Sequence, residues 1–250
     1  MSRWGRSALA IVLVLVAAAT PAAPVDPEAI LKAADAPHDA FSEGTIRLRV
    51  VANDHGKKAV ANVLELFVKG SDKALCVFRE GKQKGRKILT VGDRVWLIVP
   101  GTSRPVPVSK SQRLTGAASF GDVARVRLAD EYIATLRPGE DALAGEGGTT
   151  RCRVLDLAAR RKGLAYPTAV LWVGVDDGLA RRLRLSLASG KEAKDVRYTS
   201  YDDKRRIARM EIRDLLSAGD ANVTRLDFDA YQQRPLDPAL FDPEGARALP

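Results

Sequence analysis

The sequence predicts a mostly β protein with few helices, an α+β fold organised as an unclosed antiparallel β-barrel. About eleven short strand-like runs recur along the chain, separated by turns rich in glycine, aspartate and serine. Some runs are apolar on both faces, whereas the strands of an antiparallel sheet with one solvent-exposed face should alternate apolar and polar residues. Because only a few short helical segments accompany the strands, we interpret those helices as a plug or lid over an apolar hollow.

The first part of the predicted domain begins with a helix and continues as strands. Asp26 can cap this helix, and Pro27 suits its first position. In the strands that follow, apolar residues alternate with charged ones, which is the period-two pattern of a half-buried strand. These predicted strands are 45–51, 62–69, 74–79, 86–91 and 94–99.

The middle of the chain is predicted to be irregular and then helical. Pro105 and Pro107 exclude a helix from the connector 100–121. A helix is predicted over 122–132, and a glycine-rich turn then leads into more strands. This second group comprises 151–157, 169–175, 182–187, 196–201, 207–214 and 223–230.

One-sided and two-sided strands occur side by side in this sequence. Residues 95–99 are apolar throughout, whereas Leu183 and Leu185 alternate with Arg182 and Arg184. A strongly curved sheet accounts for both patterns if it wraps around the helices. We therefore expect a buried concave face and a mostly polar convex face.

The N-terminal residues have the pattern of a secretory signal peptide. Arg3 and Arg6 precede an uncharged apolar run, 8–19, and small residues follow that run. The run is shorter than the roughly 20 residues that a membrane span needs. We expect a cleaved signal at 1–23 and a single domain at 24–250, with an uncleaved anchor as the alternative.

The two cysteines, Cys76 and Cys152, are candidates for a disulfide, because an exported protein enters an oxidising compartment. Each also lies in a strand-like run, so two buried thiols are the alternative. Since Cys76 is the first cysteine, no lipid-attachment cysteine follows the signal, and we expect a soluble mature protein. The two histidines, His38 and His55, have no companions at metal-site spacing. We expect no metal and no cofactor.

The formal charge of +9 comes from basic residues spread through strands and turns. Because these residues do not gather on one helix, we expect no nucleic-acid partner and only transient contact with a membrane surface. The sequence contains no nucleophile elbow, zinc-protease motif or phosphate loop. The acidic pairs at 176–177 and 202–203 lie at turns, where aspartate is favoured for backbone bonding. We therefore expect a binding protein and not an enzyme.

Several short motifs occur in a specific order from Asp39 to Phe241. The most specific are GRKIL at 85–89 and GDRVWLIVP at 92–100. The others are Gln112-Arg113, Gly116, Ser119-Phe120-Gly121-Asp122, Asp130-Glu131-Tyr132, Tyr166-Pro167, the Trp172 strand, Gly190-Lys191-Glu192-Ala193-Lys194, Arg209-Met210-Glu211-Ile212, Thr224, Asp237-Pro238 and Phe241-Asp242-Pro243. In this order they resemble the periplasmic LolA-like family of outer-membrane lipoprotein-sorting proteins.

The resemblance implies a half-barrel with helical lids and a cavity that receives lipid chains. It implies a monomeric periplasmic carrier that binds the acyl chains of lipoproteins, or another lipid, and delivers them toward the outer membrane. An inner-membrane transporter is then a candidate donor. The alternative is an interaction module that senses lipid or lipoprotein in the cell envelope. The family's lid-latching arginine has three candidates here, Arg47, Arg49 and Arg79.

We expect the cavity wall to come from apolar side chains of the predicted strands, each of which could equally be ordinary core. The candidates are Ile46, Leu48, Val50, Leu64, Leu66, Trp96, Ile98, Leu171, Leu185, Met210, Leu226 and Phe228. Val123, Val126 and Leu128, on the predicted helix, are the candidate lid residues. Because aromatic residues make up only 6% of the chain, we do not expect an aromatic-lined cavity.

Overall fold

The computed structural model describes residues 25–38, 41–53, 59–109, 111, 113–119, 127–145, 148–217 and 223–249. The predicted signal at 1–23 and the predicted lid residues Val123 and Val126 lie outside these residues.

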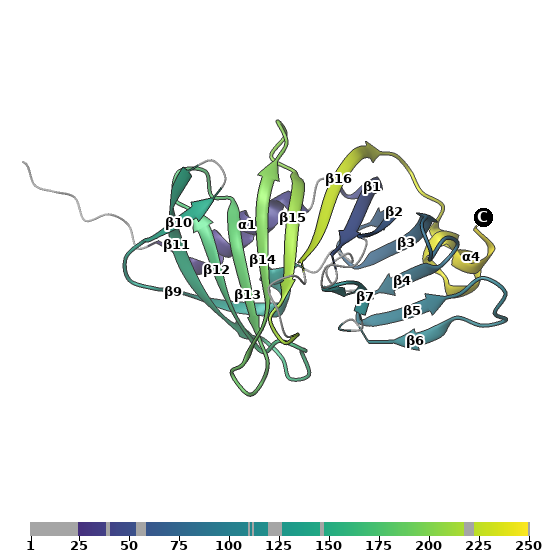
Figure 1. Ribbon diagram of the computed structural model, residues 1–250, viewed down its shortest axis with the longest axis horizontal. Coiled ribbons are helices and arrows are strands. Elements are labelled where there is room, and N and C mark those ends of the chain that lie inside the picture. Colours follow the sequence, from purple (N-terminus) through teal and green to yellow (C-terminus); the bar gives the residue numbers. More distant parts are fainter. Residues whose placement is uncertain are drawn as a thin grey trace, which may run out of the picture.

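The described chain is dominated by antiparallel strands, which confirms the predicted fold class (Figure 1). The strands are β1 (Glu43–Ala52), β2 (Val60–Lys69), β3 (Lys73–Glu80), β4 (Lys87–Val91), β5 (Arg94–Ile98), β6 (Val106–Val108), β7 (Arg113–Thr115), β8 (Ala118–Ser119), β9 (Tyr132–Leu136), β10 (Asp141–Gly145), β11 (Gly148–Ala159), β12 (Thr168–Gly174), β13 (Ala180–Ser186), β14 (Glu192–Tyr201), β15 (Ile207–Asp214) and β16 (Val223–Gln233). The helices are α1 (Pro27–Asp35), η1 (Ala36–His38), α3 (Leu128–Glu131), η2 (Pro238–Phe241) and α4 (Pro243–Ala248).

One 14-stranded sheet contains every described strand except β7 and β8, which form a separate hairpin. The sheet runs β10-β11-β12-β13-β14-β15-β16-β1-β2-β3-β4-β5-β6, and β9 pairs with β11. The last strand, β16, therefore returns beside the first, with Leu48 opposite Phe228 and Val50 opposite Leu226. The sheet curves and leaves its two end strands, β10 and β6, unpaired with each other, so the barrel is open.

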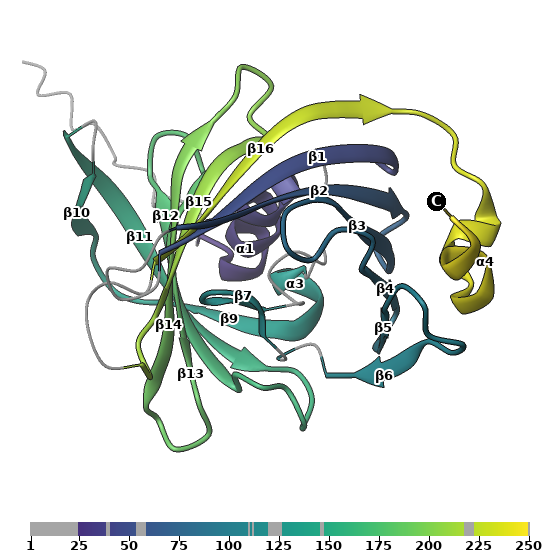
Figure 2. The same ribbon diagram turned by 45° about the vertical axis from the view of Figure 1, so that its right-hand side comes forward.

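Helix α1 forms where the sequence predicts it. The Asp26 side chain accepts a hydrogen bond from the Glu28 backbone N–H at 3.0 Å, and Pro27 opens the first turn. Leu31 and Ala34 are buried on one side of the helix. Figure 2 shows α1 and α3 inside the curve of the sheet, where they cover part of its concave face. The apolar stripe of α1 thus packs into the main core.

The predicted helix over 122–132 is shorter in its described part than the sequence suggests. Only α3 is helical there, and Tyr132 already begins strand β9. From Tyr132 onward, burial alternates residue by residue, and the strand pairs with β11. Tyr132, the last residue of the predicted helix, is therefore the first residue of strand β9 in the structure.

The connector that was expected to be irregular contains the short edge strand β6. Its Pro107 lies opposite Trp96 of β5. Proline is tolerated here because an edge strand needs to bond with one neighbour only. Because Pro107 has no backbone N–H, the strand also offers one hydrogen-bond donor fewer to another chain, which discourages edge-to-edge pairing.

The hairpin β7–β8 packs against the concave face near strands β1 and β16. Gly116, in its turn, has φ +58°, and a Cβ there would come within 2.6 Å of the Ala52 Cβ. The next residue, Ala117, donates its N–H to the Thr224 hydroxyl at 2.7 Å. Thr224 is buried, so glycine at 116 allows the hairpin to approach the sheet closely.

A second apolar cluster lies on the convex side of strands β2–β5. There η2 and α4 cover Leu75, Val77 and Leu89 with Phe241 and Ala246. Figure 2 shows α4 on the opposite side of these strands from α1 and α3. The expectation of a mostly polar convex face is therefore wrong over β2–β5. The two-sided pattern of β5 is explained by this C-terminal cover.

Two buried or half-buried lysines fasten the C-terminal segment to the sheet. Lys87, 6% exposed, donates to the backbone carbonyls of Ala246 and Arg247 at 3.1 and 3.2 Å, and also to Leu249. Lys69 donates to Glu43 at 2.7 Å and to the Leu236 carbonyl at 3.2 Å. The Lys87 ammonium thus satisfies carbonyls at the C-terminal end of α4, where a cation is favourable.

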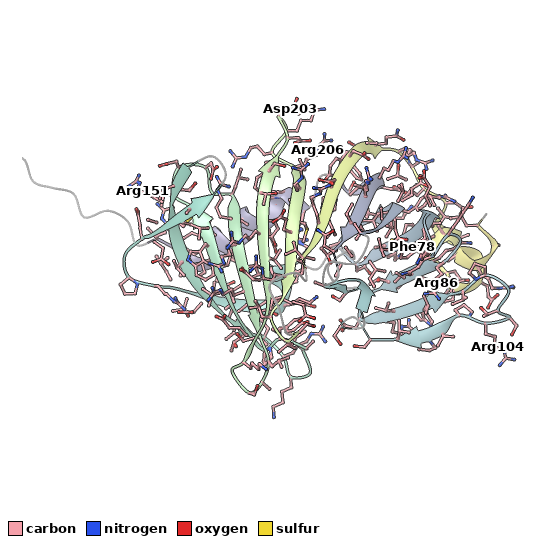
Figure 3. The ribbon with its side chains drawn as sticks, viewed as in Figure 1. Phe78, Arg86, Arg104, Arg151, Asp203 and Arg206 are labelled. Atoms are coloured by element: carbon pink, nitrogen blue, oxygen red, sulfur yellow. The ribbon has the colours of Figure 1, made fainter. Side chains whose placement is uncertain are left out.

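Charged residues gather at the hairpin ends, as Figure 3 shows for Arg151, Asp203 and Arg206. Arg206 pairs with Asp202 at 2.6 Å within the β14–β15 turn. No helix in the described part of the chain has the length and apolarity that a membrane-spanning helix needs.

Candidate functional site

A cavity of about 430 Å³ lies on the concave side of the sheet, beneath η1 and α3. Its apolar wall comes from strands that are distant in sequence but adjacent in the sheet, since β13 to β16 lead directly into β1 and β2. The apolar lining is Ile46, Leu66, Leu183, Leu185, Val196, Ile207, Met210 and Phe228. On β13 the two-residue period places Leu183 and Leu185 on this inward face. On β15, Ile207 and Met210 are three residues apart, and both face the cavity because the pairing with β14 has register shifts there.

Five of the predicted wall residues line this cavity, namely Ile46, Leu66, Leu185, Met210 and Phe228. The predicted lid residue Leu128, on α3, also lines it. Five more predicted residues belong to the same core but are packed away from the cavity; these are Leu48, Val50, Leu64, Leu171 and Leu226. All five are fully buried by side chains, so part of the concave face is ordinary core.

The structure does not bring Trp96 and Ile98 to the cavity. Both lie on the convex face of β5, in the cluster beneath the C-terminal segment. Their neighbours Val95 and Leu97 take the inward positions. The prediction chose the wrong face because β5 is apolar on both.

The three arginines proposed as lid latches lie on the convex side. Arg79 binds Glu65 with its Nη2 atom 2.7 Å from the carboxylate, and Arg47 lies 3.6 Å from Glu80. Arg49 alternates with the inward-facing Leu48 and Val50 on β1. A different arginine stands at the cavity.

That arginine is Arg161, in the loop between β11 and β12. Its Nη2 atom lies 2.6 Å from the Asp93 Oδ1 atom and 3.8 Å from the Glu131 Oε1 atom, and all three residues line the cavity. Asp93 is in the β4–β5 turn, so the ion pair joins hairpins near opposite ends of the open sheet. The side chains of Arg161 and Asp93 are 50% and 66% exposed, while Glu131 is 16% exposed. We call these three residues the mouth.

Two carboxylates hold the helices over the cavity. Asp35, at the end of α1, accepts the Ala129 N–H of α3 at 2.8 Å. Glu28 accepts the Ala134 N–H of β9 at 2.8 Å and also binds Arg160. Asp35 thus acts as an N-terminal cap for a helix other than its own.

Aromatic residues also line the cavity, contrary to expectation. Four of the five tyrosines do so, namely Tyr132, Tyr166, Tyr198 and Tyr231. Tyr132 donates its hydroxyl to the Tyr166 carbonyl at 2.7 Å, and Tyr231 donates to the Ile207 carbonyl at 2.6 Å. Burial, with smaller effects of Glu131 and Tyr166, raises the pKa of Tyr132. His38 meets Tyr198 edge to face, with ring centroids 5.7 Å apart.

The two cysteines are not bridged. Cys76 and Cys152 are both buried free thiols, in separate apolar clusters. Burial raises the pKa of the Cys76 thiol, which opposes formation of a reactive thiolate. The candidate disulfide is therefore wrong. Within the described ranges, no three histidine, cysteine, aspartate or glutamate side chains come together as metal ligands.

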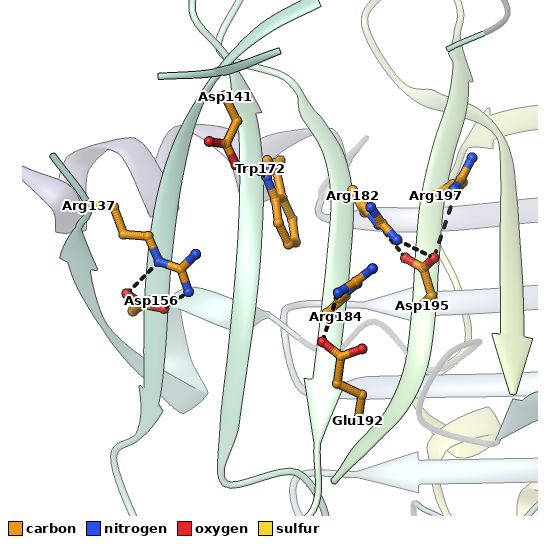
Figure 4. Close-up of polar contacts among 9 residues, drawn as sticks. All are labelled: Arg137, Asp141, Asp156, Trp172, Arg182, Arg184, Glu192, Asp195 and Arg197. Carbon is orange, nitrogen blue, oxygen red and sulfur yellow. Dashed lines mark hydrogen bonds and ion pairs between the residues drawn. The ribbon is translucent and has the colours of Figure 1, made fainter. Parts of the chain in front are cut away.

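The convex face of β9–β14 carries paired charges (Figure 4), but it also contains a small apolar cluster of Cys152, Val154 and Trp172, so the expected polar face is found only in part. Arg182 binds Asp195 with two hydrogen bonds of 2.6 and 2.7 Å, and Arg184 binds Glu192 at 2.8 Å. Trp172, the one large aromatic residue drawn on this face, donates its indole N–H to Asp141 at 2.8 Å. Arg182 and Arg184 are thus compensated by carboxylates on the same face.

A family model described only as "Uncharacterized protein" matches residues 70–245. No match exists among curated proteins.

Solved structures show the same fold. A LolA superfamily protein from Nitrosomonas europaea is 23% identical, with a TM-score of 0.78 over 88% of this chain and 99% of its own. A DUF1329 family protein from Desulfovibrio piger is 20% identical, with a TM-score of 0.73 over 87% of this chain and 98% of its own. A domain assigned to outer membrane lipoprotein sorting, from Vibrio parahaemolyticus, is 15% identical, with a TM-score of 0.72 over 88% of this chain and 98% of its own. The chain therefore belongs to the matched family of uncharacterized proteins, and its fold is LolA-like.

Proposed function

We propose that this protein binds lipid acyl chains in the cavity and carries them through the periplasm toward the outer membrane. The observation that carries the proposal is the cavity of about 430 Å³ between the apolar concave wall and the helices above it. Proteins normally fill their interiors to crystal-like density, so a space of this size has a function or is destabilising. The lining has an apolar wall and a charged mouth, which suits a ligand with an apolar tail and a polar head.

The energetics favour an acyl chain. Burial contributes about 0.8 kcal/mol per methylene, so a chain of about fourteen carbons gains about 11 kcal/mol. Loss of translational and rotational freedom opposes this by about 4 kcal/mol or more. The difference is large enough for stable binding and small enough for a membrane or a partner to compete for the chain.

The cellular assignment follows from the N-terminal pattern together with the fold. A signal peptide directs the chain across the inner membrane. Two of the similar structures carry names that refer to the LolA superfamily and to outer membrane lipoprotein sorting. The proposal includes a transporter in the inner membrane that transfers the lipid to this protein. No catalytic step is assigned.

Extraction of the protein purified from the periplasm of a Gram-negative host tests the proposal. We expect about one equivalent of acyl chain by mass spectrometry, and much less from a Leu185→Trp variant, whose indole fills cavity space. Ser186→Trp is the matched control, because the next residue on β13 faces the opposite side of the sheet. Lipid-free wild-type protein, or equal lipid in both variants, would refute the proposal. An empty cavity with a stable protein partner would support a sensing module instead.

A further inference from the structure

One end of the molecule carries exposed basic side chains that have no acidic partner in the described part of the chain. We propose that this end binds the surface of an anionic lipid bilayer through Lys82, Lys84, Arg86 and Arg104. We call these four residues the basic end. The proposal goes beyond carriage in the cavity, because it concerns the surface by which the protein contacts a membrane.

Two connections between strands form the basic end. The β3–β4 turn carries Lys82, Lys84 and Arg86, and the β5–β6 loop carries Arg104. The turn and the loop line one cleft together. They also lie in contact, since a Cβ on Gly85 would come within 2.8 Å of a proline side chain in the loop. Figure 3 shows Arg86 and Arg104 at the same end of the molecule.

The charges of the basic end are available to a partner. All four side chains are exposed, and within the described ranges none of them forms an ion pair. Arg86 reaches only the neutral side chain of Gln83, at 3.5 Å. An anionic surface that binds here therefore does not have to displace a carboxylate of the protein.

Basic residues that crowd together elsewhere in the sequence are paired with carboxylates. Arg160 binds Glu28, and Arg161 binds Asp93. These two adjacent arginines are exposed like the residues of the β3–β4 turn, but each already has an acidic partner. The basic end therefore differs from them in pairing and not in exposure.

The β3–β4 turn presents its basic side chains from an ordered backbone. Gly85 donates its N–H to the Phe78 carbonyl at 2.9 Å, and Phe78 donates its own N–H to the Arg86 carbonyl at 2.9 Å. Because the backbone is already fixed, binding at this turn does not have to order the chain.

An apolar side chain beside the basic residues favours a bilayer over other anionic partners. Val106 follows Arg104 and Pro105 at the start of β6, and it is 50% exposed. A membrane interface accepts such a side chain at the boundary of the acyl chains, while lysine and arginine side chains extend to the phosphate groups. A polar, acidic protein surface offers the same charge but gives Val106 no apolar surroundings.

The basic end lies away from the mouth of the cavity. In the β4–β5 hairpin, Lys87 lies opposite Ile98 next to the basic end, whereas Asp93 is in the turn at the other end of the hairpin. A bilayer bound at the basic end therefore leaves the mouth accessible to a protein donor or acceptor.

Sedimentation with lipid vesicles tests the proposal on the purified protein. The vesicles contain either phosphatidylcholine alone or a mixture of phosphatidylcholine and phosphatidylglycerol. We expect binding to the anionic vesicles at low salt, and weaker binding as the salt concentration rises. Equal binding to both kinds of vesicle, or binding to neither, overturns the proposal.

A triple variant tests the position of the binding surface. A lysine or arginine near an anionic bilayer strengthens binding about fivefold, so the variant with Lys82→Gln, Lys84→Gln and Arg86→Gln should bind about 100-fold more weakly. Val106→Ser should also weaken binding to the anionic vesicles. Unchanged affinity in Val106→Ser overturns the bilayer as the partner that this surface selects.

The matched control removes the same charge from the other half of the sheet. It combines Lys162→Gln, Lys191→Gln and Lys204→Gln, all in exposed connections between β11 and β15. We expect this control to bind at least about tenfold more tightly than the first triple variant. Equal weakening by the two triple variants would mean that net charge alone decides binding, which overturns the basic end as the contact surface.

The cavity variant Leu185→Trp separates this proposal from the carrier function. It should bind anionic vesicles as the wild type does, because the basic end is unchanged. Loss of vesicle binding in Leu185→Trp would place the membrane contact at the cavity and overturn the proposal. A wild-type protein that contains no lipid but binds anionic vesicles would refute the carrier function and leave the basic end standing.

Discussion

Asp35 connects the two helices above the cavity, and its removal should loosen them measurably. The residue is 3% exposed, and its Oδ2 atom accepts the Ala129 N–H at 2.8 Å. In Asp35→Ala this half-buried donor loses its acceptor, a loss of about 1–3 kcal/mol. Loss of a helix cap costs a similar amount, about 0.5–2 kcal/mol. Because the cap is this same hydrogen bond, the two figures are not added. We therefore expect a loss of about 2 kcal/mol. For a chain of this size, that lowers Tm by about 4–8 °C.

Thermal unfolding and amide hydrogen exchange measure this effect. Asp26→Ala is the matched control, because Asp26 caps its own helix at an exposed site. It should lose less stability and leave exchange in α3 unchanged, whereas Asp35→Ala should accelerate exchange at Ala129. Asp35→Asn keeps an acceptor of the same shape and should retain most of the stability. Equal destabilisation by the two alanine variants, with no change at Ala129, would refute the connecting role of Asp35.

Three further predictions concern other parts of the molecule. Lys87→Met should cost about 1–3 kcal/mol and speed exchange in α4, because the helix loses its buried donor. Burial, with a smaller effect of Arg79, lowers the pKa of Lys87, so the folded protein loses this proton at a lower pH than the unfolded chain does. The free energy of unfolding of the wild-type protein should therefore increase as the pH rises from that lowered pKa to about 10.4. The Lys87→Met variant should show no such increase in a pH series. Burial alone would raise the pKa of Asp202, but its hydrogen bonds with Arg206 and Lys204 lower it. Its stabilising contribution should be present above about pH 4 and lost as pH falls through the lowered pKa, and Asp202→Asn should lack this acid-dependent part in urea titrations. Both thiols should resist Ellman's reagent in the folded protein and react on unfolding, while reducing agent leaves Tm unchanged; a Tm that falls on reduction would contradict the free-thiol assignment.

Alternation along the strands predicted much of the cavity wall. In β1, Ile46 and Leu48 alternate with arginines, so the inward face is evident from the sequence. Strand β5 is apolar on both faces, and alternation could not orient Trp96. What decides its orientation is the C-terminal segment, whose Phe241 covers the convex face of the neighbouring strands. This long-range packing has no local signal in β5.

The mouth and the tyrosines were not predictable in the same way. Asp93 and Arg161 are 68 residues apart, and each lies in a turn or loop where a charged residue is unremarkable. Tyr132 lies in a stretch that the sequence predicted as helix, so its inward direction could not be derived. Distances between hairpins near opposite ends of the sheet depend on its curvature. That curvature results from the whole set of strands and not from any one motif.

Met210 offers the most direct measurement of whether an acyl chain enters the cavity. The chain contains only two methionines, Met1 and Met210, and Met210 lines the apolar wall. Delipidated protein labelled with ¹³C-methyl methionine is titrated with monotetradecanoylglycerol. We predict that the Met210 methyl resonance shifts and saturates at one equivalent; once the predicted signal peptide, which contains Met1, is removed, this is the single methionine resonance of the protein. A Met210 resonance that does not move at saturating lipid would contradict the account.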